Sequence, residues 1–347
     1  PGQNRFIVHA VDPPGGHPKR FTEKERQVGD PATGFSATIG RWPNGRRAAL
    51  SLRFDDSHPT HLSMAIPILR EYGFRGTFMI NPGGLDGRSP NSRWRSAFQE
   101  RLAEWKAVAQ RGDQEFANHT AHHRGADNDA DMEREISDAS RIIWKMFPGK
   151  SRLVALNLGG GTHWETTRTM RHYLDKHHLF ETGGSLGMDD VYGKRVEAFR
   201  QHLLRHIERG IWCRAHFHYI GEKLSSSEEN FRAAMDIAKE NEAELWIAGM
   251  ADIYKYQTER AGATLALVSS GPDAASLRLS CSTDRKLFDH PLSLSIKPPA
   301  SWIGHRVKVI DAKGKSMATQ QLRLNGDEIL YFECAPVNSI FTVEKVD

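Results

Sequence analysis

The chain has 347 residues, which is enough for one large core or for a large and a small domain. Lys and Arg (47) nearly balance Asp and Glu (43), and the net charge of +4 is spread over the whole length, so nucleic acid is a poor first expectation for a partner. No run of about 18 apolar residues occurs, which argues against a membrane span. No charged-then-apolar leader opens the chain, which fits a cytosolic protein or the mature form of an exported one.

The first predicted region, residues 1–46, is rich in Gly, Pro and charged residues and holds one strand-like run, FIVHAV. We expect it to form an N-terminal arm laid over the next domain. From Arg47 onward, short apolar runs alternate with helical patterns, and each pair occupies roughly 30 to 40 residues, the length of a βα unit. Seven strands are predicted, at 48–54, 76–81, 114–119, 153–158, 179–184, 211–218 and 244–249.

Segments whose apolar residues recur at helical spacing lie between several of these strands. A helix is predicted up to Tyr72, with Gly73 as its stop, and a second helix is predicted to end at Gly112. A third covers residues 131–147, with one apolar face made of Met132, Ile136, Ala139 and Ile143. The alternation predicts an α/β domain over residues 47–260, built on a parallel sheet or barrel.

After Arg260 the pattern changes to six short β-rich runs with no helix between them: TLALVS, SLRLSCS, LSLSIK, RVKVID, EILYFE and SIFTVE. Turn signals such as KGK and NGD separate several of these runs, as hairpins require. We therefore predict a small antiparallel, sandwich-like β-domain over residues 261–347.

The segment RFDDSHPTH places Asp55 and Asp56 where the first strand ends, at the rim that is the catalytic face of barrels. Adjacent residues at a strand end point in different directions. One carboxylate can therefore bind a metal while its neighbour holds or deprotonates a water. The alternative interpretation is that the pair caps a helix that begins near Thr60.

The segment FANHTAHH follows another predicted strand and places His119 and His123 four residues apart. One turn of helix would bring both imidazoles to the same face. Two imidazoles and one carboxylate are a ligand set for a borderline metal ion, with positions left for water and substrate. A pairing of His119 with His122 is the alternative. Both this segment and the FDD segment end predicted strands, which makes them candidates for a single site.

Three segments together resemble the NodB-like polysaccharide deacetylase family, also called carbohydrate esterase family four: FDD, then GFRGTFMIN one helix later, then NHTAHH. The resemblance covers roughly residues 45–260 and is strongest before residue 125. It implies a distorted (β/α) barrel of about seven strands, which agrees with the seven strands counted above. It also implies an enzyme that removes acetyl groups, usually from N-acetyl sugars and sometimes from O-acetyl xylan.

By the same resemblance, Asp55 would be the general base, and Asp56, His119 and His123 would bind zinc or a similar divalent ion. The family also uses a late histidine as proton donor to the leaving group. The run IWCRAHFHYIG offers His216 and His218, which share one strand face because they are two residues apart. We favour His218, which lies nearer the strand end, with His216 orienting it or binding sugar.

The chain departs from the family pattern in one place. Where an Arg-x-Pro-Tyr-Gly-like segment supplies an arginine partner for the base, this chain reads LNLGGGTHW, without an arginine. Its glycines can still expose N–H groups to an oxyanion, and His163 and Trp164 are candidates for contact with a sugar ring. Asp189 and Asp190 lie where the family often has a further polar residue.

These observations predict a metal-dependent deacetylase acting on an acetylated carbohydrate, with an N-acetyl sugar polymer or oligomer as the favoured substrate. The expected cofactor is one divalent ion, with Zn favoured and Co, Ni or Mn as alternatives. The alternative functions are an allantoinase-like metal-dependent amide hydrolase of the same fold and an inactive carbohydrate-binding protein. A secreted or periplasmic location is favoured over the cytoplasm. The sequence leaves the oligomeric state open.

Overall fold

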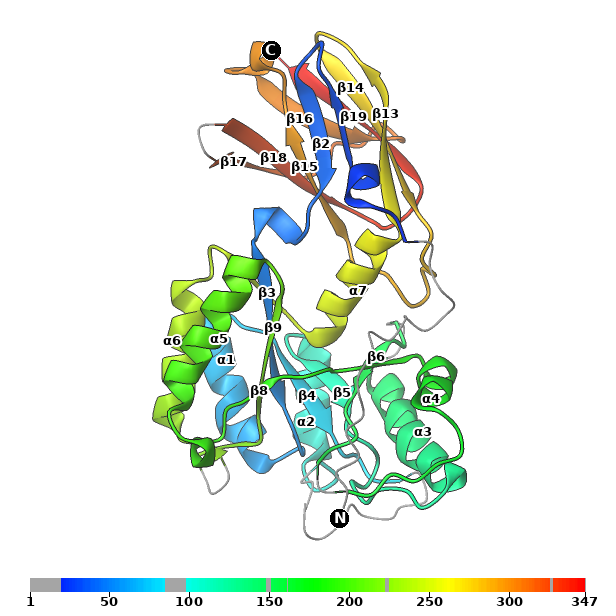
Figure 1. Ribbon diagram of the computed structural model, residues 1–347, viewed down its shortest axis with the longest axis vertical. Coiled ribbons are helices and arrows are strands. Elements are labelled where there is room, and N and C mark those ends of the chain that lie inside the picture. The colour runs from blue at the N-terminus through cyan, green and yellow to red at the C-terminus, as the bar shows by residue number, and fades with distance from the viewer. Residues whose placement is uncertain are drawn as a thin grey trace. The chain divides into compact units, whose positions relative to one another are not determined.

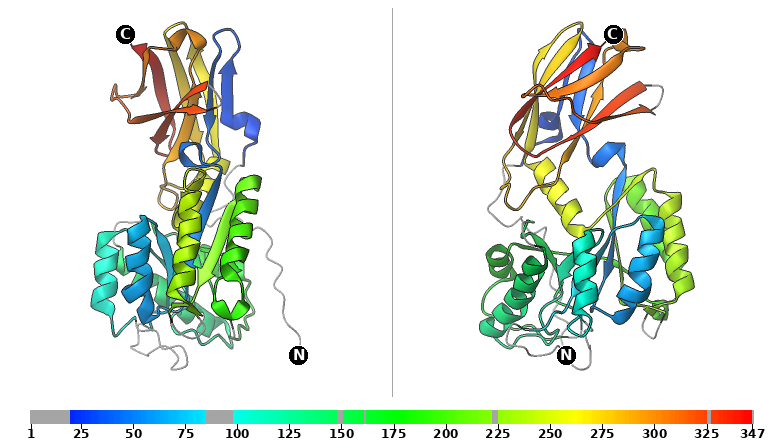
Figure 2. Two further views of the ribbon diagram at one scale, coloured as in Figure 1. Left: turned by 90° about the vertical axis from the view of Figure 1, so that its left-hand side faces the viewer. Right: turned by 180° about the vertical axis from the view of Figure 1, so that it is seen from behind.

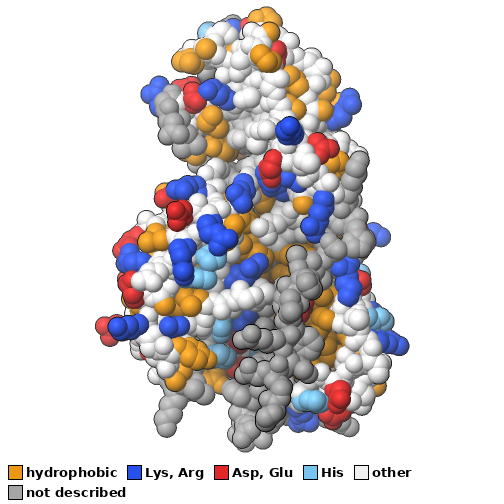
Figure 3. All heavy atoms as spheres, viewed as in Figure 1, with side chains coloured by type: hydrophobic (Ala, Val, Ile, Leu, Met, Phe, Trp, Pro, Cys, Tyr) orange, Lys and Arg blue, Asp and Glu red, His pale blue; other side chains and the backbone are white. Residues whose placement is uncertain are grey.

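The computed structural model describes residues 20–84, 98–147, 151–160, 162–221, 225–324 and 327–346. These residues form two compact units. The first spans residues 48–253, and the second combines residues 20–47 with residues 254–346. In the described part of the chain, no helix combines the length and the apolar character needed to cross a membrane. Basic and acidic side chains are interspersed on the face that Figure 3 shows, as the near-balance of charge predicts.

The first unit is built on one parallel sheet, whose described strands run in the order β7-β6-β5-β4-β3-β9-β8, with β12 paired to the start of β3. Each of the seven predicted strands corresponds to one of these, and only the short β8 is additional. The strands are β3 (Ala48–Phe54), β4 (Gly76–Ile80), β5 (Glu115–Asn118), β6 (Val154–Leu156), β7 (Leu179–Glu181), β8 (Leu186–Gly187), β9 (Trp212–Phe217) and β12 (Leu245–Ile247).

The sheet curls into a distorted, incompletely closed barrel. Strands β7 and β8 stand at opposite ends of the strand order, yet only residues 182–185 separate them along the chain. A flat sheet of seven strands would be roughly 29 Å wide, whereas a connection this short spans at most roughly 18 Å. The two end strands must therefore approach each other. This confirms the predicted α/β fold class.

Helices cover the outer side of the sheet, with α1, α5 and α6 grouped together (Figure 1; Figure 2). The predicted stops at Gly73 and Gly112 are confirmed, because both glycines adopt the left-handed conformation of a helix C-cap. The helices are α1 (Ile66–Tyr72), α2 (Leu102–Arg111), α3 (Asp129–Met146), α4 (Met170–His177), α5 (Arg195–Arg209), α6 (Glu228–Glu240) and α7 (Met250–Ala261).

A stack of phenylalanines sets which face of β3 points inward. Phe54 lies between Phe78 of β4 and Phe217 of β9, with ring centroids 4.8 Å and 5.3 Å away, and all three rings are fully buried. Phe231 of α6 packs edge-on against Phe54, so this face of the strand is the helix-covered one. Since side chains alternate along a strand, the residues on either side of Phe54 must point to the opposite, inner face.

The second unit is a pair of antiparallel sheets, ordered β1-β2-β15-β18-β17 and β13-β14-β19-β16. Phe332 of one sheet contacts Phe341 of the other, with ring centroids 5.3 Å apart, so the two sheets pack face to face. The predicted antiparallel β-domain is therefore present. Its strands are β1 (Gln27–Asp30), β2 (Phe35–Ile39), β13 (Ala263–Ser270), β14 (Ala274–Cys281), β15 (Leu292–Lys297), β16 (Arg306–Asp311), β17 (Thr319–Leu324), β18 (Asp327–Cys334) and β19 (Ser339–Val346).

The expectation of an N-terminal arm over the barrel is wrong for the described residues 20–46. Strand β2 pairs with β15, and its alternate residues Phe35, Ala37 and Ile39 are buried in the second unit. The sequence analysis missed this strand because its polar residues, Ser and Thr, make FSATI only weakly apolar. The first unit also ends earlier than the predicted residue 260, at Ile253. The predicted run FIVHAV lies outside the described residues.

Candidate functional site

A cavity of about 660 Å³ lies at the carboxyl ends of the parallel strands of the first unit. Because all parallel strands of a curled sheet end at one rim, residues far apart in the sequence meet there. The volume falls in the range of small-molecule sites. Its polar lining comes from the ends of six strands and includes Arg53, Asp55, Asp56, His119, His123, Asn157, Thr182, Asp189, His216 and His218.

The three predicted metal ligands converge in this cavity. Oδ1 of Asp56 lies 3.2 Å from Nε2 of His119 and 3.6 Å from Nε2 of His123, and all three side chains are buried. One donor atom from each lies within 4.8 Å of the others. Asp56 has a φ of 78°, which breaks the strand alternation and turns its carboxylate into the same cavity as that of Asp55.

The two histidines reach this position through an irregular loop, so the predicted turn of helix is wrong. Thr120 and His123 adopt left-handed backbone conformations, with φ of 67° and 53°. Local side chains hold this strained path: the Thr120 N–H donates to Oδ1 of Asn118, and the His123 N–H donates to Oγ1 of Thr120. Such strain persists where surrounding contacts fix it, and it is typical of functional sites.

A hydrogen bond at the far side of its ring orients the ligand His119. Nδ1 of His119 donates to the backbone carbonyl of Asn157 at 2.9 Å, which leaves the lone pair of Nε2 facing Asp56. The alternative ligand His122 is oriented elsewhere, because its Nδ1 is bonded to Glu135 of α3 at 2.7 Å and it does not line the cavity. The structure therefore favours the pairing of His119 with His123 over that with His122.

The donor set fits a divalent ion of the zinc type. Among the described residues, Oδ1 of Asp56 is buried and forms no hydrogen bond of regular geometry, although two imidazole nitrogens stand close to it. Burying a carboxylate oxygen is costly unless a charge or a hydrogen bond compensates it. A cation held by one carboxylate oxygen and two imidazoles supplies that compensation, with positions left for water and substrate.

Asp55 has a partner that the sequence analysis missed. Oδ2 of Asp55 accepts a hydrogen bond of 2.9 Å from Nη2 of Arg53, and Nη1 of Arg53 donates to Oγ1 of Thr182. Both charged side chains are buried. Although burial alone would raise the pKa of Asp55, the positive charge of Arg53 holds it below the usual range. The carboxylate of Asp55 is thus bound to Arg53 and does not cap the following helix.

The resemblance implied an arginine partner for Asp55 after the fourth strand, where this chain has none, and Arg53 on β3 is the arginine that contacts Asp55. Arg53 stands two residues before Asp55, so both point to the inner face, opposite Phe54. The signal was visible in the sequence as the Arg of RFDD, but only the strand register shows that its side chain shares a face with the carboxylate.

The half-buried His218 forms a second pair, with the buried Asp189. Nδ1 of His218 donates to Oδ2 of Asp189 at 2.6 Å, and the His218 backbone N–H reaches Oδ1 of the same carboxylate. Burial acts to lower the pKa of His218, but the hydrogen bond to Asp189 and the charge of Asp55 outweigh it and raise the pKa to about 9. The imidazole is therefore protonated at neutral pH, as a proton donor requires.

His216 lies beside His218 but differs in charge. Its Nδ1 is 2.9 Å from Oγ of Ser185, and burial together with the nearby Arg53 lowers its pKa to about 4. A neutral His216 can donate or accept a hydrogen bond but is a poor acid. The two histidines thus differ in their hydrogen-bond partners and in the direction of their pKa shifts.

The two candidate sugar contacts lie outside the cavity. His163 is largely exposed and pairs with Glu165. The backbone of Trp164 forms an isolated β-bridge with that of Ala126. Neither residue lines the described cavity. The expectation of substrate contact at these two residues finds no support in this geometry. In the adjacent GGG segment, the Gly159 N–H is taken up by Oδ1 of Asn157, and residue 161 lies outside the described residues.

Comparison with known proteins places this site in context. The model of the polysaccharide deacetylase family matches residues 41–177. No curated protein matches the chain. Among solved structures, a family 4 carbohydrate esterase from Streptomyces lividans in complex with acetate is 19% identical, with a TM-score of 0.43, and the match covers 60% of this chain and 95% of that one.

Two further structures match at similar levels. A family 4 acetyl xylan esterase from Clostridium thermocellum in complex with a cobalt ion is 16% identical, with a TM-score of 0.39, covering 59% of this chain and 90% of that one. A mutant with restored enzymatic activity, made from a carbohydrate esterase family 4 pseudoenzyme of Bacillus anthracis, is 16% identical, with a TM-score of 0.43. The match covers 61% of this chain and 68% of that one. The resemblance predicted from the sequence is thus confirmed by the family model over residues 41–177.

Proposed function

Because residues 41–177 match the polysaccharide deacetylase family, we propose that this protein is a metal-dependent hydrolase that removes acetyl groups from an acetylated carbohydrate, with an N-acetyl sugar polymer or oligomer as the favoured substrate. One observation carries the proposal: a three-donor metal set, a carboxylate held by Arg53 and a protonated histidine line a single cavity.

In the proposed reaction, Asp56, His119 and His123 hold the divalent ion, with zinc favoured. When bound, the ion supplies Lewis acidity to the attacking water and to the acetyl carbonyl. Asp55 accepts the proton of the attacking water, since its carboxylate stays ionised beside Arg53. His218, protonated and oriented by Asp189, donates a proton to the leaving amine or alkoxide.

The assay that tests the proposal measures acetate release from chitin oligomers, acetyl-xylan and peptidoglycan. We expect metal-dependent acetate from at least one of these. Asp55→Asn should lower the rate by about 10²- to 10⁴-fold, the usual contribution of a general base. Asp175→Asn is the matched control, because Asp175 is partly exposed on α4 and pairs only with Arg171 among the residues described.

Metal content tests the ligand set independently of activity. His119→Ala should lose the zinc ion held by Asp56, His119 and His123, whereas His163→Ala, a matched change at an exposed histidine, should retain it. A zinc content in His119→Ala equal to that of the unmodified chain would refute the ligand assignment. No metal-dependent acetate from any substrate would overturn the deacetylase proposal and leave the allantoinase-like or the inactive carbohydrate-binding alternative.

A further inference from the structure

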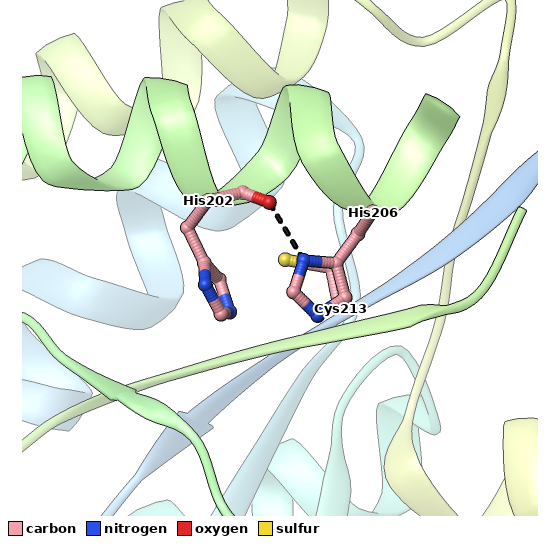
Figure 4. A group of neighbouring side chains, drawn as sticks. All are labelled: His202, His206 and Cys213. Carbon is pink, nitrogen blue, oxygen red and sulfur yellow. Dashed lines mark hydrogen bonds between the residues drawn. The ribbon is translucent and has the colours of Figure 1, made fainter. Parts of the chain in front are cut away.

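A second group of metal-binding side chains lies between helix α5 and strand β9. His202 and His206 are four residues apart on α5, so their rings stand on one helix face with centroids 4.1 Å apart. Both rings point away from the helix toward β9, where Cys213 lies (Figure 4). None of the three lines the described catalytic cavity, and Cys213 shares its strand face with Ala215 and Phe217, opposite to His216.

The donor atoms converge as closely as a metal site requires. One ring nitrogen of each histidine and the sulfur of Cys213 all lie within 4.8 Å of one another. Cys213 is a buried free thiol, whereas the two histidines are partly exposed. The thiol is therefore shielded, while an ion can enter past the imidazoles.

A hydrogen bond orients the ring of His206 for coordination. Nδ1 of His206 donates to the backbone carbonyl of His202 at 2.6 Å, as the dashed line in Figure 4 marks, so its Nε2 carries a free lone pair. Metal-binding histidines nearly always anchor the second ring nitrogen in this way.

The packing of α5 does not need these side chains. The helix buries Phe199, Leu203 and Ile207 against the sheet, and the histidines lie on the flank of that stripe. Leucine or another apolar residue at positions 202 and 206 would extend the apolar face at no cost in hydrogen bonds. A pair of imidazoles above a thiol is instead the donor set that zinc and other borderline or soft ions prefer.

We propose that His202, His206 and Cys213 form a second metal site, separate from the catalytic one, which takes a borderline ion of the zinc type and leaves one coordination position open. Binding releases the thiol proton to solvent and involves no redox step. The ion would join α5 to β9, the strand that carries His216 and His218, and would thereby stabilise the first unit.

Cobalt titration of the metal-free, full-length chain distinguishes this site from the catalytic one. A thiolate ligand gives Co²⁺ an intense charge-transfer band in the near ultraviolet, whereas the catalytic set of one carboxylate and two imidazoles contains no sulfur. We expect the band in the unmodified chain and in His119→Ala, and we expect it to be absent in Cys213→Ser. Cys281→Ser, which removes a free thiol of the second unit, is the matched control and should keep the band.

A second pair of measurements keeps the proposal testable if Cys213→Ser folds poorly. His206→Ala changes a partly exposed side chain and should weaken Co²⁺ binding, followed by the same band, by at least about tenfold. Zinc content should be two ions in the unmodified chain and one in either Cys213→Ser or His119→Ala. Absence of the band from the unmodified chain, or its persistence in Cys213→Ser, would overturn the second site while leaving the deacetylase proposal intact.

Discussion

At the scale of single residues, the buried pair of Arg53 and Asp55 governs the proposed base. A guanidinium with two directed N–H bonds, one to Asp55 and one to Thr182, fixes both the charge and the orientation of the carboxylate. Removing one partner of such a pair leaves an uncompensated buried charge, at a cost of about 3–5 kcal/mol. Arg53 is therefore expected to act as a positioning residue for Asp55.

Arg53→Met should raise the pKa of Asp55, because the burial that opposes ionisation then acts without the compensating charge. Asp55 works as a carboxylate, so activity is lost as pH falls through its pKa, and raising that pKa moves the acid limb of kcat/KM to higher pH. We expect this shift together with a loss of about 10²-fold near neutral pH. Arg53→Lys should recover part of both effects, because it restores the charge without the second hydrogen bond. A uniform loss with an unmoved acid limb would show that Arg53 is merely structural.

The pair of His218 and Asp189 is expected to set the alkaline limb of the pH profile, as Arg53 and Asp55 set the acid limb. His218 acts in its protonated form, so activity persists below its pKa of about 9 and is lost as pH rises through that value. Asp189→Asn removes the charge that raises this pKa, and the alkaline limb of kcat/KM should move to lower pH. Asp190→Asn is the control, since the neighbouring carboxylate bonds Ser227 and Asn230 instead. Identical alkaline limbs in the two variants would contradict the assigned role.

At the scale of structural elements, the loop after β6 supports the proposed metal ligands by leaving space. Gly159 has a φ of 81°, and a Cβ at this position would lie 2.2 Å from Nε2 of His123. The glycine is thus required twice, by the left-handed backbone and by the close approach of the imidazole. The sequence analysis considered the GGG segment as a donor of N–H groups to an oxyanion. In the structure, its first glycine leaves the space that the imidazole of His123 occupies.

Gly159→Ala should therefore displace His123 and weaken zinc binding by at least about tenfold. Gly160→Ala provides a matched control in the adjacent residue, because nothing lies within 4 Å of a Cβ placed there. Zinc affinity is measured by competition with a chelator of known strength. Equal affinities for the two variants would show that the loop yields without disturbing His123.

At the scale of the whole molecule, the second unit depends on two distant parts of the chain. Strand β2 lies between β1 and β15 in its sheet, so residues 35–39 complete a core whose remainder follows residue 254. Burial of a side chain such as Ile39 contributes about 1.5–3 kcal/mol. The N-terminal segment is therefore a structural part of the second unit.

Ile39→Ala should lower the free energy of unfolding by about 2–5 kcal/mol, the usual cost of truncating a buried aliphatic side chain. Thr38→Ala changes the neighbouring residue, on the opposite and less buried face of β2, and should cost less than about 1 kcal/mol. Chemical denaturation of the full chain measures both. Equal costs would mean that β2 is not part of the core.

The sequence by itself determined what depends on local pattern. Periodicity located the seven strands and the glycine helix stops, because alternation and helical spacing directly record which side chains are buried. The spacing of FDD and NHTAHH identified Asp55, Asp56, His119 and His123 as one candidate site, because both segments follow strands that end at the same rim.

Only the tertiary structure decided the pairings between distant residues. It brought Asp189 to His218, joined β2 to β15 across about 250 residues, and gathered His202, His206 and Cys213 from a helix and a strand. It also placed His163 and Trp164 outside the cavity lining and paired Asp55 with Arg53. These contacts depend on strand register and sheet curvature, which the packing of the whole chain determines and which leave no periodic trace in the sequence.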